Sequence, residues 1–482
     1  MPTRSRTGIA STLLAVATAV IAFPTSAVEL PGQLPEPDGR APDTSKPVKV
    51  YILAGQSNMV GMGEISGGNR RHSTFFTSAE GGVAGVEVSV YAGAYSPTAD
   101  YGKLTPQATK TVTYGGTKPD AFPEIAGEAT YVVRGLIEVE TSGVYVFSPG
   151  YRDSKDNVME LEGREVYRKE PGGEAVQTPA TLVGGKRHPF QVTFLTEAAN
   201  GLFWLARIDI PGTLTTLVKQ EKKFPHLLDD DGEWTTRNDV VYHEARIKFK
   251  GGPLTVPPLP GNGTIGPELQ FGHVMGHYHD EQVLVIKTAM GNRALAWDFR
   301  PPSSGKLPNV REDLKKWEGL EYRLMVEGVR KTLDHIASII PNYKGQGYEI
   351  AGFGWWQGHK DGGSKEWIAE YESNLVNLIN DVRAEFKVPK LPVVVATVGF
   401  GGKEMGENHL QTLEAQMAVG DPVKHPEFAG NVLSVDTRDF WRSADESPKK
   451  QGYHYNRNAE TYVLVGDALG RAMVELVRRR ED

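Results

Sequence analysis

Short apolar runs alternate with amphipathic stretches in much of the chain. Val48 to Leu53 is a short apolar run, and similar runs recur at 283–288, 350–356, 391–398 and 432–435. Three longer stretches repeat apolar residues at helical spacing, at 311–340, 366–386 and 460–479. Alternating strands and helices are typical of a mostly parallel sheet covered on both faces. The pattern therefore predicts an α/β domain.

A different pattern fills residues 82–212. Short alternating runs are separated by Gly, Pro and Asp, for example at 86–91, 131–137, 143–147 and 190–194, and helical spacing is nearly absent. Short strands with regular turn signals are typical of a β-sandwich. We therefore predict an inserted β-sandwich at 82–212, which divides the α/β domain into the pieces 48–81 and 213–482.

The N-terminus has the pattern of a secretory signal. Arg4 and Arg6 precede an apolar run from Ile9 to Phe23, and small residues lead to Ala27. The run is shorter than the roughly 20 residues that span a bilayer. We predict a signal peptide at 1–27, a Pro- and Gly-rich linker at 28–47, and export to the periplasm or medium without stable membrane insertion after cleavage. An uncleaved membrane anchor is the alternative.

Composition narrows the chemistry. The 482 residues include no cysteine, which excludes disulfides, thiolate catalysis and cysteine-bound zinc. A formal net charge of −7 lacks the basic excess of a nucleic-acid binder, so we expect no nucleic-acid partner. Catalysis would fall to a hydroxyl, carboxylates or histidines.

Two residues are candidates for nucleophilic catalysis. Ser57 follows the first strand within Gly55-Gln56-Ser57-Asn58-Met59, where open α/β sheets place ligand sites. His454 lies just before the last helix and has the pKa range of a general base. The alternatives are a helix-capping serine and a surface histidine.

Two further segments directly follow predicted strands. Gly291 would let a backbone N–H approach a ligand closely. In Trp355-Trp356-Gln357-Gly358-His359, Gln357 could supply an amide donor and the tryptophans a face for sugar stacking. Each alone is ordinary strand-to-loop sequence. Together with Ser57 and His454 they favour a hydrolase site at the carboxyl ends of the strands.

A histidine-rich segment offers a rival hypothesis. His273, His277, His279 and Asp280 form H-x3-H-x-H-D, and the first two would share one helix face, as divalent metal ligands can. Ligand sets also need the correct geometry. Polar histidines near a helix end are the simpler interpretation, so we predict no metal and no cofactor.

Five ordered blocks resemble the SGNH hydrolase superfamily, and more narrowly the sialate O-acetylesterase-like carbohydrate esterases, which carry the GQSNM motif. The blocks lie at 50–59, 265–268, 287–295, 353–361 and 452–458. The resemblance implies a three-layer α/β/α, flavodoxin-like fold. It also implies Ser57 as nucleophile, His454 as general base and acid, and the Ser57 N–H, Gly291 and Gln357 as oxyanion donors. Gln56, Asn58 and Trp356 would contact substrate.

The chain departs from the family pattern in three places. The family often has Asp three residues before its histidine, where this chain has Gln451. His454 would then be oriented by a backbone carbonyl, or by an upstream acid among Asp436, Asp439 and Asp445. Asn292 replaces a glycine of the second block, and His359 replaces the usual Glu.

The β segment resembles protective-antigen-type β-sandwiches, which often accompany glycan-active enzymes, so carbohydrate binding is implied. Asp153 and Asp156 could hold calcium, although two carboxylates are few for the six to eight oxygens that calcium takes, and a solvated loop is the simpler interpretation.

We expect an exported serine esterase that removes O-acetyl groups from a carbohydrate, either sialic acid or an acetylated polysaccharide, through an acetyl-enzyme. A glycan-binding protein on a weakly active or inactive esterase scaffold is the alternative, and a lipid or aryl ester is a further possible substrate. The sequence leaves the sugar, the catalytic acid and the oligomeric state open.

Overall fold

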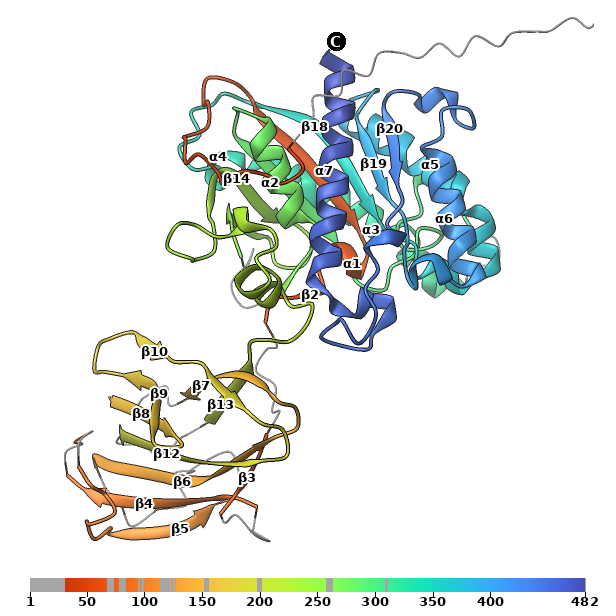
Figure 1. Cartoon of the computed structure of the whole chain (residues 1–482). Helices are drawn as coiled ribbons and strands as arrows, with labels where there is room; N and C mark the ends of the chain where they lie inside the picture. The colour runs from red at the N-terminus through yellow and green to blue at the C-terminus, as the bar shows by residue number, and fades with distance from the viewer. Residues whose placement is uncertain are drawn as a thin grey trace, which may run out of the picture.

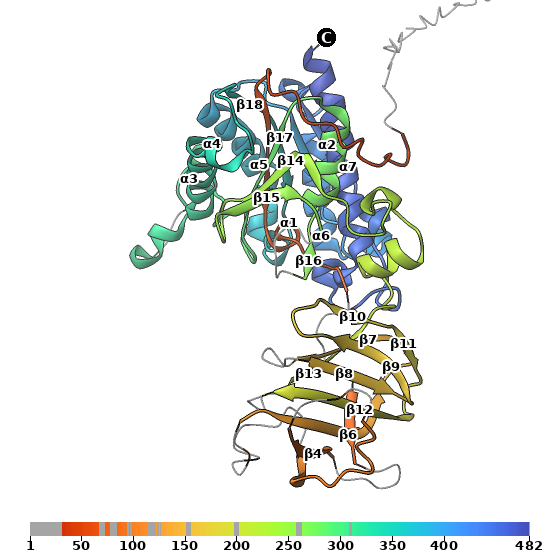
Figure 2. The ribbon, with the colours of Figure 1, turned by 90° about the vertical axis from the view of Figure 1, so that its left-hand side faces the viewer.

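The computed structural model describes residues 31–66, 73–77, 84–93, 96, 99–112, 122, 125, 127–150, 156–196, 202–256, 263–307 and 311–481. The predicted signal peptide and Asp153 lie outside these residues. Two groups of strands are separated in both views, with β3 to β13 below and the remaining strands among the helices above (Figures 1 and 2).

A seven-stranded sheet runs through the upper group in the order β15-β14-β17-β1-β18-β19-β20. All neighbours are parallel except β14 and β15, which are antiparallel at one edge. The strands are β1 (Val48–Gly55), β14 (Arg237–Glu244), β15 (Lys250–Leu254), β17 (Val283–Ala289), β18 (Tyr348–Trp356), β19 (Val393–Ala396) and β20 (Val432–Val435). Strands β14 and β15 were not expected from the sequence.

Successive residues of β1 enter two different cores. Tyr51 and Leu53 lie in one core with residues of α2 and α7, whereas Val50 and Ile52 lie in a second core with residues of α3 and α5. Helices therefore cover both faces of the sheet, and its central strands are buried on both sides. The mixed α/β class predicted from the sequence is confirmed. The helices are α1 (Ser57–Val60), α2 (Glu268–Tyr278), α3 (Leu320–Asp334), α4 (Ile336–Ile339), α5 (Lys365–Phe386), α6 (Glu407–Val419) and α7 (Ala459–Glu481).

The prediction of one continuous helix over 311–340 was wrong. Residues 312–317 form a 3-10 helix, and α3 and α4 follow it as separate helices. Gly319 separates the first two with a left-handed φ of 63°, and a Cβ there would lie 2.8 Å from the Arg300 carbonyl oxygen. The backbone at this position can accommodate only glycine without strain.

The chain between β1 and β14 forms two antiparallel sheets. The larger has the order β10-β9-β8-β12-β6-β4-β5, with β3 also paired to β6, and the smaller has the order β11-β7-β13. Both contribute to one core, in which Phe147 of β7 packs with Val133 of β6 and Val192 of β12. The strands are β3 (Ser73–Phe76), β4 (Val86–Ala92), β5 (Ala108–Val112), β6 (Ala129–Val139), β7 (Gly143–Gly150), β8 (Asp156–Leu161), β9 (Arg164–Lys169), β10 (Ala175–Gln177), β11 (Ala180–Leu182), β12 (Arg187–Thr196) and β13 (Leu202–Arg207).

Two boundaries differ from the sequence expectation. Strand β3 pairs with β6 and ends before residue 82, so this β module begins earlier than predicted. The expected linker also packs on the α/β part, because Leu34 is 3% exposed and the Asp43 N–H donates to Asp280 O at 2.8 Å. A further two-stranded ribbon joins β2 (Gly63–Glu64) to β16 (Thr264–Ile265).

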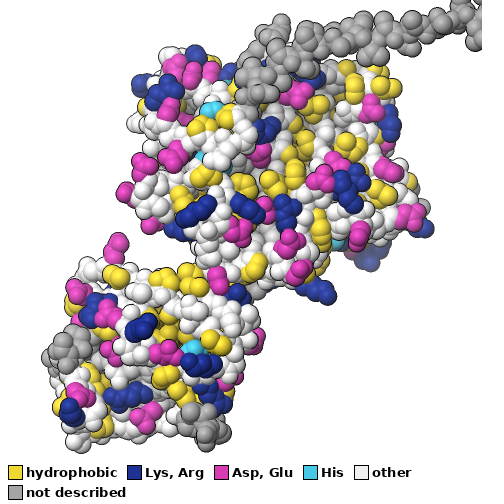
Figure 3. All heavy atoms as spheres, in the orientation of Figure 1, with side chains coloured by type: hydrophobic (Ala, Val, Ile, Leu, Met, Phe, Trp, Pro, Cys, Tyr) yellow, Lys and Arg dark blue, Asp and Glu magenta, His cyan; other side chains and the backbone are white. Residues whose placement is uncertain are grey.

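The surface carries charges of both signs. Lys and Arg side chains are interspersed with Asp and Glu over the face in Figure 3, without a large patch of either sign. Among the described residues, no helix is long and apolar enough to cross a bilayer.

Candidate active site

The carboxyl ends of β17, β1 and β18 lie side by side and position three of the segments singled out in the sequence. Gly55 is in register with Ala289 on one side and Trp356 on the other. A Cβ at Gly55 would lie 2.1 Å from the Trp356 carbonyl oxygen, so only glycine fits this turn. The Met290 N–H donates to Gly55 O at 3.2 Å. The close strand packing thus sets where the chain leaves β1.

Ser57 is the first residue of α1, directly after that turn. It is 7% exposed, and its hydroxyl has no hydrogen-bond partner among the described residues. A Cβ at Gly291 would lie 3.7 Å from the Ser57 Cβ, so the two residues are neighbours. Asn292 has a φ of 57°, a left-handed conformation that asparagine tolerates better than most side chains. The structure therefore brings Ser57 and Gly291 together.

A buried ion pair lies below the serine turn. Lys287 Nζ is 2.9 Å from Glu268 Oε1, and the two side chains are 4% and 1% exposed. The same Nζ donates to Val60 O, at the end of α1, at 2.7 Å. A buried charge that lost its partner would cost several kcal/mol. The pair therefore holds the short helix that carries Ser57.

The loop that carries His454 has an unusual backbone. Tyr455, Asn456 and Arg457 have φ values of 49°, 53° and 58°, three consecutive non-glycine residues in the left-handed region. The Asn456 side chain accepts from the Gln451 N–H at 2.9 Å and donates to Arg442 O at 3.0 Å. Such strain persists only where surrounding contacts enforce it, and it is concentrated at functional sites.

Side chains next to Ser57 connect to this loop. Asn58 Nδ2 donates to Tyr453 O at 3.3 Å. The Tyr462 hydroxyl, from α7, lies 2.9 Å from Asn58 Oδ1 and 3.1 Å from His454 O. The residue after Ser57 is thus tied to both His454 and the residue before it.

The His454 ring is partly buried and has no hydrogen-bond partner among the described residues. Burial, together with the positive charges of Arg457 and His359, lowers the pKa of His454 to about 4. The imidazole is therefore neutral above about pH 4, as a general base must be.

The structure does not bring the three expected acids to His454. Asp436 binds the Arg438 guanidinium, with Nη2 2.6 Å from Oδ2. Asp439 pairs with Lys403 at 2.7 Å. A hydrogen bond from Ser443 lowers the pKa of Asp445.

The backbone of Gln451 is hydrogen-bonded to the loop that carries His454. Its carbonyl oxygen accepts from the His454 N–H at 2.8 Å. Its side-chain nitrogen donates to the Tyr453 hydroxyl at 2.6 Å, while Oε1 is buried without a partner among the described residues.

Gln357 is held in a buried network. Its Nε2 lies 3.1 Å from Gln56 Oε1, 2.9 Å from Arg293 O and 2.5 Å from Asp361 Oδ2. An amide nitrogen carries two protons. Because three protein acceptors already share them, the amide connects the ends of β1 and β18 with the loop after β17.

Asp361 was not singled out as a site residue from the sequence, although it closes the fourth block. It is fully buried and accepts from the Leu295 and Ala296 N–H groups, each at 2.9 Å. Burial raises the pKa of Asp361 to about 6, although these hydrogen bonds oppose the rise. The carboxylate fixes the loop that follows Gly291.

The three expected substrate contacts need correction. Trp356 is 2% exposed and donates through Nε1 to Thr397 O, so neither face of its ring is open to a sugar. Gln56 and Asn58 are 2% and 3% exposed, and their amides bind protein groups. These buried side chains therefore hold the site together through protein contacts and do not face a substrate. The open aromatic surface is Tyr453, which is 47% exposed and lies 5.7 Å from the His359 ring.

The histidines of the rival metal hypothesis are engaged separately. His273 and His277 both lie on α2, as expected, but His273 is buried against the His226 ring. His279 Nε2 is 2.7 Å from the Tyr51 hydroxyl. No group of three or more His, Asp or Glu side chains in the described ranges could hold a metal ion.

The chain has low similarity to several solved structures. A protein from Arabidopsis thaliana is 16% identical, with a TM-score of 0.34, over 50% of this chain and 87% of that one. A carbohydrate acetylesterase from Xanthomonas citri is 13% identical, with a TM-score of 0.34, over 71% and 70%. A carbohydrate esterase family 2 enzyme with its carbohydrate-binding domain, from Myceliophthora fergusii, is 11% identical, with a TM-score of 0.29, over 73% and 95%.

No curated protein matches the chain significantly. The model of one protein family, described as carbohydrate esterase, sialic acid-specific acetylesterase, matches residues 217–475. This range is more than half of the chain and includes Gly291, Gln357, Asp361 and His454. The chain therefore belongs to the sialic acid-specific acetylesterase family of carbohydrate esterases and is a carbohydrate O-acetylesterase.

Proposed function

We propose that this acetylesterase works through Ser57 as nucleophile and His454 as general base, with an acetyl-enzyme intermediate. The observation that carries the proposal is the connection between the two residues. Asn58 and Tyr462 tie the serine turn to the histidine loop, while the serine hydroxyl and the imidazole ring each lack a hydrogen bond to a described residue.

The reaction follows from these groups. Ser57 Oγ attacks the acetyl carbonyl carbon while His454 accepts the hydroxyl proton. The tetrahedral intermediate collapses when the bond to the sugar oxygen breaks and His454 returns the proton to that oxygen. Water then attacks the acetyl-enzyme with His454 again as base, which releases acetate and restores Ser57.

We assign two oxyanion donors, the backbone N–H groups of Ser57 and Gly291. The Ser57 N–H belongs to the first turn of α1, where N–H groups lack intrahelical partners. Each such donor is typically worth about 3–4 kcal/mol in the transition state. The Gln357 amide, expected as a third donor, is instead proposed as a positioning group, because three protein acceptors already surround its nitrogen.

The sugar would contact the aromatic surface beside His454. Tyr453 is exposed there, and the His359 ring lies between Tyr453 and Phe400, with centroids 5.7 Å and 5.2 Å away. Aromatic faces pack against the C–H faces of sugars, so Tyr453 replaces Trp356 as the proposed contact. The substrate class remains acetylated polysaccharide or acetylated sialic acid.

The arrangement of the whole chain is also part of the proposal. We propose a three-layer SGNH-type hydrolase domain built from the chain before β3 and the chain after β13, with a protective-antigen-type β-sandwich, β3 to β13, inserted between these two pieces. Residues 1–27 would direct export, and 28–47 would follow as a docked N-terminal segment rather than a free linker.

Acetate release from acetylated xylan, acetylated glucomannan and acetylated sialosides tests the mechanism. Ser57→Ala and His454→Ala should each lower the rate by roughly 10³-fold or more, because removing a nucleophile or its base leaves only binding and oxyanion stabilisation. Ser338→Ala, an exposed serine outside the site, is the control and should match wild type. Equal rates for wild type and Ser57→Ala would contradict the assignment.

One observation favours the second candidate, a glycan-binding protein with a weak esterase site. No described carboxylate orients His454, and loss of the orienting acid slows triads of this kind by about 10⁴-fold. Tight polysaccharide binding with acetate release that does not depend on Ser57 would decide for this alternative.

A further inference from the structure

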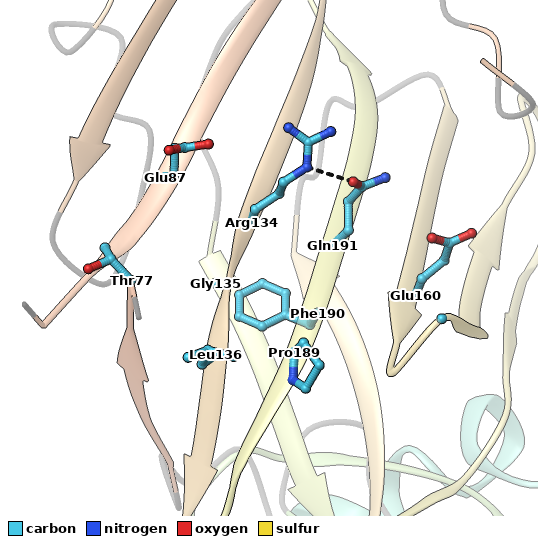
Figure 4. Close-up of a pocket in the computed structure, with 10 residues that line it drawn as sticks. Thr77, Glu87, Arg134, Gly135, Leu136, Glu160, Pro189, Phe190 and Gln191 are labelled. Atoms are coloured by element: carbon cyan, nitrogen blue, oxygen red, sulfur yellow. Dashed lines mark hydrogen bonds between the residues drawn. The ribbon is translucent and has the colours of Figure 1, made fainter. Parts of the chain in front are cut away.

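A pocket of about 510 Å³ opens on the larger sheet of the β module, away from Ser57 and His454. Its lining comes mainly from four adjacent strands, β4, β6, β12 and β8 (Figure 4). A pocket of this size is in the range that holds small-molecule ligands.

Four polar side chains cross this pocket in one row. The strand register places Glu87 opposite Arg134, Arg134 opposite Gln191, and Gln191 opposite Glu160. The next residue along each strand is buried in the module core, namely Val88, Val133, Val192 and Met159. Because side chains alternate along a strand, the polar row points to the outer face.

Most hydrogen-bonding groups of the row are unused. Arg134 Nε donates to Gln191 Oε1 at 2.8 Å, as Figure 4 shows. The two terminal guanidinium nitrogens, and the carboxylates of Glu87 and Glu160, have no side-chain partner among the described residues. By contrast, Arg187 and Glu138 on the same sheet pair directly at 3.3 Å.

An apolar row lies beside the polar one. Leu136 and Pro189 are paired across β6 and β12, one step along from Arg134 and Gln191 on the same face, and both line the pocket. The pocket therefore offers a guanidinium donor, an amide and two carboxylate acceptors next to an apolar surface. A sugar ring presents the same combination, with hydroxyls on its rim and C–H groups on its faces.

Part of the outer face is already covered by the chain itself. Tyr101 packs on Tyr91 and Val132, and the Tyr91 hydroxyl donates to Tyr101 O at 2.9 Å. The polar row lies beyond this cover, where the pocket remains open to solvent.

We propose that this pocket is a non-catalytic glycan site that binds a neutral sugar unit of the polysaccharide acted on by the esterase site. Two carboxylates against one guanidinium leave a net negative row, which disfavours acidic sugars such as sialic or uronic acids. The proposal rests on the carbohydrate substrate of the proposed function but not on the Ser57 mechanism. It narrows that substrate to a neutral acetylated polysaccharide.

Affinity electrophoresis of the mature chain carrying Ser57→Ala measures binding without deacetylation. The probes are soluble xylan and glucomannan, with polygalacturonate as the acidic comparison. We expect retardation by at least one neutral polymer, and a Kd raised about tenfold or more by Arg134→Ala, because a charge-assisted hydrogen bond is lost. Arg168→Ala, in the same module but outside the pocket, should leave binding unchanged.

A charge-removing variant sharpens the test. Glu87→Gln together with Glu160→Gln should weaken binding to the neutral polymer and allow polygalacturonate to bind, because Arg134 is then unopposed. Hydrolysis of 4-nitrophenyl acetate by Arg134→Ala with Ser57 intact should equal wild type, which separates this site from the catalytic one. The proposal is overturned if neither neutral polymer is retarded, if only polygalacturonate is, or if Arg134→Ala and Arg168→Ala behave alike.

Discussion

The serine side and the histidine side of the active site are held in place by different means. Around Ser57, a glycine turn, a buried ion pair and the Gln357 network fix the backbone through close packing and hydrogen bonds. Around His454, three consecutive left-handed residues hold the loop, and the ring packs on Tyr453 without a hydrogen bond to a described residue. The proposed nucleophile is thus positioned by many contacts, whereas the proposed base is positioned by its backbone and by the neighbouring Tyr453 ring.

The difference indicates where the site should be robust and where it should respond to change. Changes beneath the serine should cost both stability and activity, because the same groups hold the sheet ends together. Changes at the histidine loop should alter rate and pH dependence more than stability.

Among changes to the residues that support Ser57 and His454, the largest effect is expected from Gly55→Ala. The added Cβ would lie 2.1 Å from the Trp356 carbonyl oxygen, so β1 and β18 must separate and stability should fall by at least the ~1–3 kcal/mol typical of overpacking. A shift of the serine turn by about 1 Å should lower kcat/KM about 100-fold. Thermal unfolding and acetate release measure the two losses. Gly363→Ala, which has open space around it, should change neither.

The second-largest effect is expected from Asp361→Asn, which also lies on the serine side of the site. An asparagine oxygen cannot accept all three hydrogen bonds, and leaving a buried donor unpaired costs about 1–3 kcal/mol. Because burial raises the pKa of Asp361 to about 6, the native state binds this proton more readily than the unfolded state between about pH 4 and 6. Its contribution to stability therefore declines as pH rises through that window.

Urea unfolding at several pH values separates the two effects of Asp361→Asn. The variant should be less stable than wild type at every pH. It should also lack the decline in the free energy of unfolding that Asp361 causes between about pH 4 and 6. Equal stability and an unchanged slope would show that the carboxylate does not hold the loop after Gly291.

On the histidine side, Asn456→Ala and Asn456→Gly distinguish backbone from side-chain effects. Both remove the bonds to Gln451 and Arg442, but only alanine also opposes the left-handed φ, at a cost of about 1–2 kcal/mol. We expect kcat for the alanine variant to fall below that of the glycine variant by roughly 5–30-fold. Equal kcat values would show that the backbone conformation does not position His454.

The smallest and most specific change is Gln451→Asp, which supplies a carboxylate on the histidine loop. A nearby negative charge should raise the pKa of His454 from about 4 by roughly 1–3 units. The base must be neutral, so activity falls as pH drops through this pKa, and the acidic limb of kcat/KM should move upward with it. Gln451→Asn is the uncharged control, and an unmoved limb in the aspartate variant would contradict the account of His454.

The position of the site was more predictable than its internal contacts. Ser57, Gly291 and Gln357 each follow an apolar run, and parallel strands place the ends of such runs at one edge of the sheet. The engagement of the Gln357 amide could not be predicted, because its partners Gln56 and Arg293 come from separate loops. Trp356 was expected to contact substrate, but Trp355 and Trp356 are both buried, and the sequence pattern alone did not show this.

Errors in the fold also have physical causes. Strand β14 (Arg237–Glu244) lies next to the edge strand β15, and polar residues interrupt its apolar pattern. Residues 311–340 have apolar residues at helical spacing, which predicted one helix. The left-handed Gly319 instead separates a 3-10 helix from α3. Strand β3 is only four residues long, too short for periodicity to reveal that the β module had begun.

Labelling with a fluorophosphonate, followed by mass spectrometry of the peptides, tests the central claim most directly. This reagent reacts with serines that an adjacent base has activated. The account predicts modification at Ser57 in the wild-type chain, with labelling much slower in His454→Ala and unaffected in Ser338→Ala. Modification of another serine, or labelling of Ser57 at the same rate without His454, would contradict the Ser57–His454 pair.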